Sequence, residues 1–207
     1  MLVSGPRGEW TSLVILCVLI WVLRFVPALR LGLPSQEGVR GKLFALVLFL
    51  TLLGCFIAIV VLYQRSPVFL VSTMAIVWVA DIGAYFAGRA FGRRKLAPTI
   101  SPGKSWEGVL GGWVAVIALA ALAALTPALS DTFPAVLQRT YGWPAWLFMM
   151  SLLVAASVVG DLFESLLKRH AGVKDSSNLL PGHGGVLDRI DALIPVMPLA
   201  LLLAPRS

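Results

Sequence analysis

The stretch LFALVLFLTLLGCFIAIVVLY, residues 43–63, has no charged side chain in 21 consecutive positions. An α-helix needs about 20 mostly apolar residues to cross a hydrocarbon core of about 30 Å, so this stretch is predicted to span a membrane. The composition agrees, since 58% of the 207 residues are apolar, 13% are charged, and the mean hydropathy is +0.89. A soluble domain carries about 25% charged residues, and a disordered chain is poor in apolar ones. Both classes are excluded.

Five further stretches are apolar enough to be candidate spans, which makes six. The last of them is short and contains Pro195 and Pro198. We therefore expect an all-α, polytopic membrane protein that forms a single membrane domain over residues 1–207. Besides 43–63, the candidates are residues 10–29, 68–88, 109–125, 144–160 and 190–204.

The Lys and Arg residues are distributed unevenly among the loops of this six-span arrangement. Thirteen of the 17 fall in or beside the loops after the first, third and fifth candidates. Cytoplasmic loops of membrane proteins accumulate Lys and Arg, so we expect these loops in the cytoplasm and both termini on the non-cytoplasmic side. The same rule accounts for the net charge of +7, and no nucleic-acid partner is expected.

Four aspartates fall near the cytoplasmic ends of predicted spans. Asp81 interrupts the third candidate about 20 Å past Val68, Asp161 follows the fifth, and Asp188 and Asp191 flank the start of the sixth. A carboxylate in or beside a membrane is costly unless it is paired, ligated or solvated. Mg²⁺ takes oxygen ligands, usually one or two carboxylates together with substrate phosphates. The four aspartates are therefore candidate Mg²⁺ ligands, although a salt bridge or a helix-packing hydrogen bond is the alternative for Asp81.

Helical spacing groups some of these acids with basic residues. Asp161, Glu164, Ser165 and Lys168 lie at i, i+3, i+4 and i+7 and so share one helix face. A simple ion pair between Glu164 and Lys168 is the alternative to a functional role.

The loop at residues 88–108 holds five cations and several hydroxyl groups, which suit a phosphate ligand. Its candidate binding residues are Ser101, Lys104 and Ser105. Ser105 is also placed to cap the next helix, whose N-terminus would offer N–H groups to an anion. The Gly-Lys-Ser sequence is not a P-loop, because Pro98 stands where the leading glycine is needed and no strand is predicted before it. The alternative for this loop is contact with anionic lipid headgroups.

A glycine-rich turn, PGHGG, occupies residues 181–185. Such a turn lets the backbone approach a ligand closely, which makes His183, Gly184 and Gly185 candidate substrate-binding residues. We expect His183 to form hydrogen bonds in the turn rather than to act as an acid or base.

The run from Ser165 to Asp191, SLLKRHAGVKDSSNLLPGHGGVLDRID, resembles the signature of the phosphatidate cytidylyltransferases, the CDP-diacylglycerol synthases. Every position that the signature specifies is met over these 27 residues. Residues 81–92 and 100–108 resemble the same family. We therefore expect residues 68–204 to be the catalytic membrane region. The match of the N-terminal spans, residues 1–67, is undefined, and the resemblance implies an N-terminally short member.

The resemblance implies a nucleotidyltransferase of phospholipid biosynthesis. It would transfer CMP from CTP to phosphatidic acid and release CDP-diacylglycerol and pyrophosphate. The implied cofactor is Mg²⁺, with a second cation left open. The implied partners are CTP and phosphatidic acid in the bilayer, and a homodimer is a further expectation. The active site would face the cytoplasm from a bacterial inner membrane.

Residue roles follow from this interpretation. Asp161 and Asp188 are the first candidates for metal ligands, and Asp191 and Asp81 come next. The catalytic set would be Asp161, Asp188, Lys168 and Lys174. The cations expected to hold the triphosphate or the lipid phosphate are Lys104, Lys168, Arg169, Lys174 and Arg189. The attacking phosphate oxygen is already deprotonated at neutral pH, so no strong general base is required.

Three alternatives stay open, and one of them is the same transfer to a different lipid phosphate. A CTP-dependent kinase of a polyisoprenol or phytol would share the fold but move a γ-phosphate to an alcohol. The complete match of residues 183–191 favours the cytidylyltransferase. A non-catalytic transporter or scaffold would use the intramembrane aspartates as relays, but no pair of broken helices in repeated halves supports it.

Overall fold

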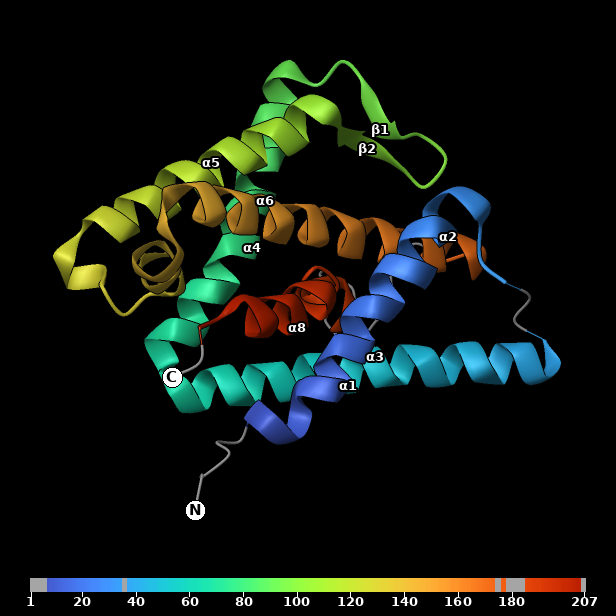
Figure 1. The fold of residues 1–207 in the computed structure, drawn as a ribbon. Helices are drawn as coiled ribbons and strands as arrows, with labels where there is room; N and C mark the ends of the chain where they lie inside the picture. The colour runs from blue at the N-terminus through green and yellow to red at the C-terminus, as the bar shows by residue number, and fades with distance from the viewer. Residues whose placement is uncertain (1–6, 35–36, 174–175, 178–184, 206–207) are drawn as a thin grey trace.

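The computed structural model describes residues 7–34, 37–173, 176–177 and 185–205 (Figure 1). Most of these residues are helical. The described elements are α1 (Arg7–Ile20), a π-helical turn (Trp21–Phe25), α2 (Val26–Leu31), α3 (Gly38–Arg65), α4 (Pro67–Phe91), β1 (Lys95–Ala97), β2 (Ser101–Ser105), α5 (Trp106–Leu125), a 3₁₀ turn (Pro127–Leu129), α6 (Phe133–His170), α7 (Leu187–Ile190) and α8 (Leu193–Leu203).

Within the described residues, five helical segments are long and apolar enough to cross a membrane. They correspond to the first five candidate spans, and they confirm the expectation of a helical, membrane-embedded protein. Their bounds are Trp10–Leu31, Gly38–Arg65, Pro67–Phe91, Trp106–Leu125 and Phe133–His170.

The sixth expected span, residues 190–204, is not confirmed. The helix found there, α8, has 11 residues, and at 1.5 Å per residue it is about 16 Å long, roughly half a hydrocarbon core. Val196, Met197 and Ala200 are fully buried, because α8 packs among α1, α3 and α6. Two turn residues, Asp191 and Ala192, separate α8 from the four-residue helix α7 and form the break between α7 and α8.

The ends of the helices that carry most Lys and Arg lie together. In Figure 1 the end of α2, the start of α3, the β1–β2 hairpin and the end of α6 lie toward the right. The α3–α4 and α5–α6 turns lie toward the left, and the C-terminus lies beside the first of them. There Arg65 Nη1 donates a 2.9 Å hydrogen bond to the carbonyl oxygen of Pro205. The chain after α8 therefore returns to the α3–α4 turn.

The strands β1 and β2 pair antiparallel and form a hairpin between α4 and α5. The sequence analysis treated residues 88–108 as a loop and predicted no strand before the Gly-Lys-Ser sequence, so the hairpin is a correction. The Trp106 N–H donates to the Arg94 carbonyl oxygen at 3.0 Å. The Glu107 carboxylate accepts from the backbone N–H groups of Arg93 and Arg94 at 3.1–3.2 Å. Because backbone polar groups need partners, these bonds favour an ordered hairpin over a loose loop.

Helix α6 extends beyond the expected span, residues 144–160, at both ends. Gly142 interrupts it with φ of 74° and ψ of 170°, a conformation that glycine adopts at little steric cost. Pro144 lies in the first turn after this break, where the N–H that proline lacks has no helical partner. At its other end, α6 carries acidic and basic residues of the expected site.

Helices α4 and α5 pack closely through small residues. A Cβ atom on Gly108 would lie 2.9 Å from the carbonyl oxygen of Ala84, and one on Gly83 would lie 2.9 Å from Ala115 Cβ. Small residues at such contacts let the backbones of membrane helices approach each other. The contact holds α4 and α5 together below the hairpin.

The first span joins the same core through aromatic rings. Phe25 stacks on Phe163 of α6 with 4.3 Å between ring centroids, and Trp21 meets that ring edge-on at 5.3 Å. Both Trp21 and Phe25 belong to the π-helical turn. The first span therefore packs directly against the helix that carries Asp161.

Candidate active site

A cavity of about 410 Å³ lies between α4, α5 and α6, next to the hairpin. It brings Asp81, Lys104, Ser105 and Asp161 of the expected site residues together. The residues that line it are Ala80, Asp81, Ala84, Tyr85, Gly88, Arg89, Gly103, Lys104, Ser105, Gly108, Val109, Gly112, Val154, Ser157, Val158 and Asp161.

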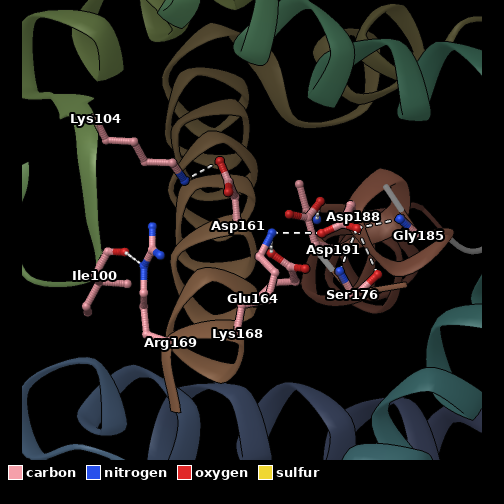
Figure 2. A network of polar contacts seen from close by, with 11 residues as sticks. Ile100, Lys104, Asp161, Glu164, Lys168, Arg169, Ser176, Gly185, Asp188 and Asp191 are labelled. Atoms are coloured by element: carbon pink, nitrogen blue, oxygen red, sulfur yellow. Dashed lines mark hydrogen bonds and ion pairs between the residues drawn. The ribbon is translucent and has the colours of Figure 1, made fainter. Parts of the chain in front are cut away.

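Lys104 and Asp161 form an ion pair in this cavity (Figure 2). The lysine is on β2 and the aspartate on α6, so the pair joins the hairpin to the helix. The lysine side chain is 23% exposed and the aspartate side chain 34%. The pair thus places a cationic group beside a carboxylate at the cavity, and the Lys104 Nζ atom itself is buried.

Two further contacts hold the hairpin in place. Arg169 Nε on α6 donates to the carbonyl oxygen of Ile100 at 3.3 Å. Ser105 Oγ accepts from the Gly108 N–H at 3.1 Å, which confirms the expected cap at the start of α5. Lys104 is therefore carried on an element fixed to both α5 and α6.

Asp191 lies at the break between α7 and α8 and interacts with the charges in the cavity. Its Oδ1 accepts from the Ala192 N–H at 2.7 Å. Burial raises the pKa of Asp191 to about 7, and the negative charges of Asp161 and Asp81 add to this rise while Lys104 opposes it. Three of the four candidate ligands, Asp81, Asp161 and Asp191, thus lie close enough for their negative charges to interact.

Asp188, the fourth candidate, is held by several donors (Figure 2). Its Oδ1 accepts from Lys168 Nζ at 2.7 Å. Its Oδ2 accepts from the Ser176 N–H at 3.0 Å, from Ser176 Oγ at 2.8 Å and from the Gly185 N–H at 2.6 Å. Burial alone would raise the pKa of Asp188, but these donors outweigh it and hold that pKa well below its usual value. Asp188 therefore organises the polypeptide around it and lies outside the described cavity lining.

Lys168 lies between two carboxylates. Its Nζ is 2.6 Å from Glu164 Oε2 and 2.7 Å from Asp188 Oδ1. Glu164 is only 3% exposed, so the ion pair expected from the helical spacing is a buried one. Lys168 thereby ties α6 to α7 and presents a partly covered cation at this junction.

The other expected residues are less closely gathered. Ser101, at the start of β2, and Arg189, in α7, are not among the described residues that line the cavity. Gly185 contributes its N–H to Asp188. Three more expected residues, Lys174, His183 and Gly184, lie outside the described residues.

The sequence analysis missed three polar residues of the cavity wall, Tyr85, Arg89 and Ser157. Arg89 Nη1 donates to the Tyr85 hydroxyl at 3.2 Å, and both residues line the cavity with Asp81. The spacing of Tyr85 and Arg89 from Asp81 could have identified them. Residues 81, 85 and 89 repeat at i, i+4 and i+8, which places them along one face of a helix.

The chemistry of these residues suits a hard divalent cation. Within the described residues, no three His, Cys, Asp or Glu side chains are gathered closely enough to hold a metal by themselves. Mg²⁺, however, is usually held by one or two carboxylates together with substrate phosphates. Asp161, with the negative charge crowded around Asp191, therefore fits a cation that arrives with a phosphate-bearing ligand.

Comparison with known proteins gives consistent matches. The model of the cytidylyltransferase family matches residues 3–205. The phosphatidate cytidylyltransferase of Pseudomonas aeruginosa is 50% identical over 129 residues, which are 62% of this chain and 44% of that protein. The protein of that name from Haemophilus influenzae is 52% identical over 123 residues, 59% of this chain and 41% of that one. The one from Thermotoga maritima is 39% identical over 171 residues, 82% and 61% of the two chains. The chain thus spans about half the length of the curated relatives it matches.

Proposed function

Because the chain belongs to the cytidylyltransferase family, we propose that it transfers CMP from CTP to phosphatidic acid and forms CDP-diacylglycerol and pyrophosphate. The observation that carries this proposal is the cavity between membrane-embedded helices in which Lys104 and Asp161 meet. The similar proteins named phosphatidate cytidylyltransferase support the same pair of substrates.

The proposed reaction is a displacement at the α-phosphorus of CTP. An oxygen of the lipid phosphate forms the new bond to that phosphorus. The bond from the α-phosphorus to the oxygen bridging to the β-phosphate breaks, and its electron pair leaves with pyrophosphate. The attacking oxygen carries no proton to be removed, so the protein positions the reactants and neutralises charge.

Asp161 is the proposed principal ligand of Mg²⁺, with Asp191 and Asp81 beside it. A cation bound there would neutralise charge on the triphosphate. Asp188 stays a proposed ligand, but it would have to exchange Lys168 or its other donors for the cation. Lys104 compensates the charge of Asp161.

The cations around the cavity are proposed to bind phosphate groups. Lys104 would turn from Asp161 to the triphosphate once the cation is bound. Arg89, which lines the cavity beside Tyr85, is placed to meet the phosphate of the lipid. Lys168 is proposed to hold phosphate while Glu164 and Asp188 restrict its direction. Arg169 supports the hairpin that carries Lys104.

The proposed orientation puts the active site at the cytoplasmic face of a bacterial inner membrane. The basic ends of α2, α3 and α6 lie toward the same end as the hairpin (Figure 1), and basic loops favour the cytoplasm. CTP would enter from the cytosol, and phosphatidic acid would enter from the bilayer between the helices.

A direct assay tests the function. Purified protein in detergent is given labelled CTP, phosphatidic acid and Mg²⁺, and lipid-linked label is separated by chromatography. We expect CDP-diacylglycerol from the wild type and almost none from Asp161→Asn. Asp131→Asn, on the exposed α5–α6 turn, is the matched control and should keep full activity.

The outcomes separate the alternatives. If CDP is released in place of pyrophosphate and an added polyisoprenol or phytol is phosphorylated, the chain catalyses the related kinase reaction. No product with either substrate would favour a transporter or scaffold. Undiminished product from Asp161→Asn would contradict the proposed role of this carboxylate.

A further inference from the structure

Gly160 lies in α6, directly before Asp161, where α6 meets the break between α7 and α8. A Cβ atom at Gly160 would lie 2.6 Å from the carbonyl oxygen of Asp191, 2.9 Å from Pro195 Cγ and 3.0 Å from Ala192 Cα. The position is buried. Any side chain at residue 160 would therefore push the α7–α8 break away from α6.

This contact links the distance between α6 and the α7–α8 break to the distance between the carboxylates of Asp161 and Asp191. Asp161 is the next residue after Gly160, and Asp191 itself supplies the carbonyl oxygen that faces Gly160. The Asp191 carboxylate is tied to the same break by its hydrogen bond from the Ala192 N–H. Moving the break would therefore move Asp191 relative to Asp161, and it would also move Asp188, which lies three residues earlier in α7.

Another buried glycine gives a useful comparison. A Cβ atom on Gly54 of α3 would collide with the side chain of Cys17 in α1. A cysteine side chain is able to change its rotamer, whereas the obstacles at Gly160 are main-chain atoms and a proline ring that is fixed to its backbone. The crowding at Gly160 thus acts directly on backbone geometry.

We infer that Gly160 is a positioning residue that sets the distance from Asp161 to Asp188 and Asp191, and thereby the affinity of these carboxylates for a divalent cation. The inference rests on the proposed function, because that function supplies the cation. It gives Gly160 a role beyond close helix packing.

The experiment compares the wild type with Gly160→Ala and Gly54→Ala, each purified in detergent. Mn²⁺, which also prefers oxygen ligands, serves as the probe. Its binding is measured by electron paramagnetic resonance with and without CTP, and thermal unfolding is measured in parallel. We expect Gly160→Ala to bind Mn²⁺ weaker by on the order of tenfold, as for other changes that misorient metal ligands. Gly54→Ala should unfold at a lower temperature yet keep wild-type Mn²⁺ affinity.

If Gly160→Ala does not fold, the double variant Gly160→Ala/Pro195→Ala takes its place. It removes the proline contact but keeps the Asp191 contact, so the same weakening is expected. Mn²⁺ affinity equal to the wild type in the folded variant overturns the inference, as does an equal loss in Gly54→Ala. A wild type that makes CDP-diacylglycerol without binding Mn²⁺ also overturns it. A wild type that binds Mn²⁺ but makes no product contradicts the proposed function and leaves the role of Gly160 standing.

Discussion

At the scale of single residues, the site is defined by which carboxylates are already paired. Asp161 is paired with Lys104 and faces a cavity. Asp188 is enclosed by Lys168, Ser176 and Gly185. The prediction from the sequence did not distinguish Asp161 from Asp188, because both are carboxylates at the ends of predicted spans. Their hydrogen-bond partners distinguish them, and those partners depend on tertiary contacts that residue spacing does not reveal.

Among the cations of the site, Lys104 leads to the most specific prediction about the rate of transfer. Replacing it by Gln keeps a polar side chain, shorter by one bond, and removes the charge that we propose to stabilise the triphosphate. We expect transfer to fall by on the order of a hundredfold, as when one preorganised donor is removed from an active site. Lys95→Gln, on the exposed side of the same hairpin, is the control for loss of positive charge alone. Equal rates for both variants would contradict the assigned role.

Asp188 leads to a prediction about pH. Because the pKa of Asp188 lies below its usual value in the fold, its hydrogen bonds stabilise the protein fully above the unfolded-state pKa of about 3.9. The contribution shrinks as the pH falls below that value. Asp188→Asn should therefore lower the unfolding temperature at about pH 7, and the difference from the wild type should narrow at about pH 3. Thermal unfolding in detergent measures this, with Asp131→Asn as control, and a difference that grows on acidification would refute it.

At the scale of elements, the sequence predicted the long apolar helices and missed the shorter structures. Residues 43–63 are apolar throughout and fall inside α3 as expected. The β1–β2 hairpin was missed because Pro98, Pro102 and Gly103 are typical of loops. Its order comes from contacts with Glu107 and Arg169. Helix α8 was taken for a span because its residues are uniformly apolar, which is equally typical of a helix buried in protein.

The hairpin provides a test at this scale. Arg169→Gln would lose the guanidinium that contacts the Ile100 carbonyl oxygen, so the hairpin should open more often. We expect faster amide hydrogen exchange in peptides covering residues 95–105, measured by mass spectrometry without substrate. Arg40→Gln, at an exposed position of α3 near the same end, should leave that exchange unchanged. Unchanged exchange in Arg169→Gln would mean that Arg169 does not support the hairpin.

At the scale of the whole molecule, the helices place most of the basic loops at one end of the molecule and the α3–α4 and α5–α6 turns at the other (Figure 1). The hairpin and the ends of α2 and α6 lie at the basic end (Figure 1). The bond from Arg65 to Pro205 brings the chain after α8 to the opposite end. The alternation of basic loops predicted this separation, even though α8 is too short to be a full span. A homodimer stays a prediction from the resemblance.

Cysteine labelling tests the orientation. Arg94→Cys, in the exposed base of the hairpin, should resist an impermeant maleimide added to intact cells and react once the cells are permeabilised. Asp131→Cys should react from outside without permeabilisation. The native cysteines, Cys17 and Cys55, are buried and should contribute little background. Labelling of Arg94→Cys from outside would reverse the proposed orientation.

The most direct measurement of the central claim follows the phosphates of CTP. Two reactions with phosphatidic acid and Mg²⁺ are run in parallel, one with CTP labelled at the α-phosphate and one with CTP labelled at the γ-phosphate. We predict that the α-label enters the lipid and that the γ-label is released as pyrophosphate, with both products absent in Asp161→Asn. Transfer of the γ-label to lipid, or lipid labelling that persists in Asp161→Asn, would contradict cytidylyl transfer at this site.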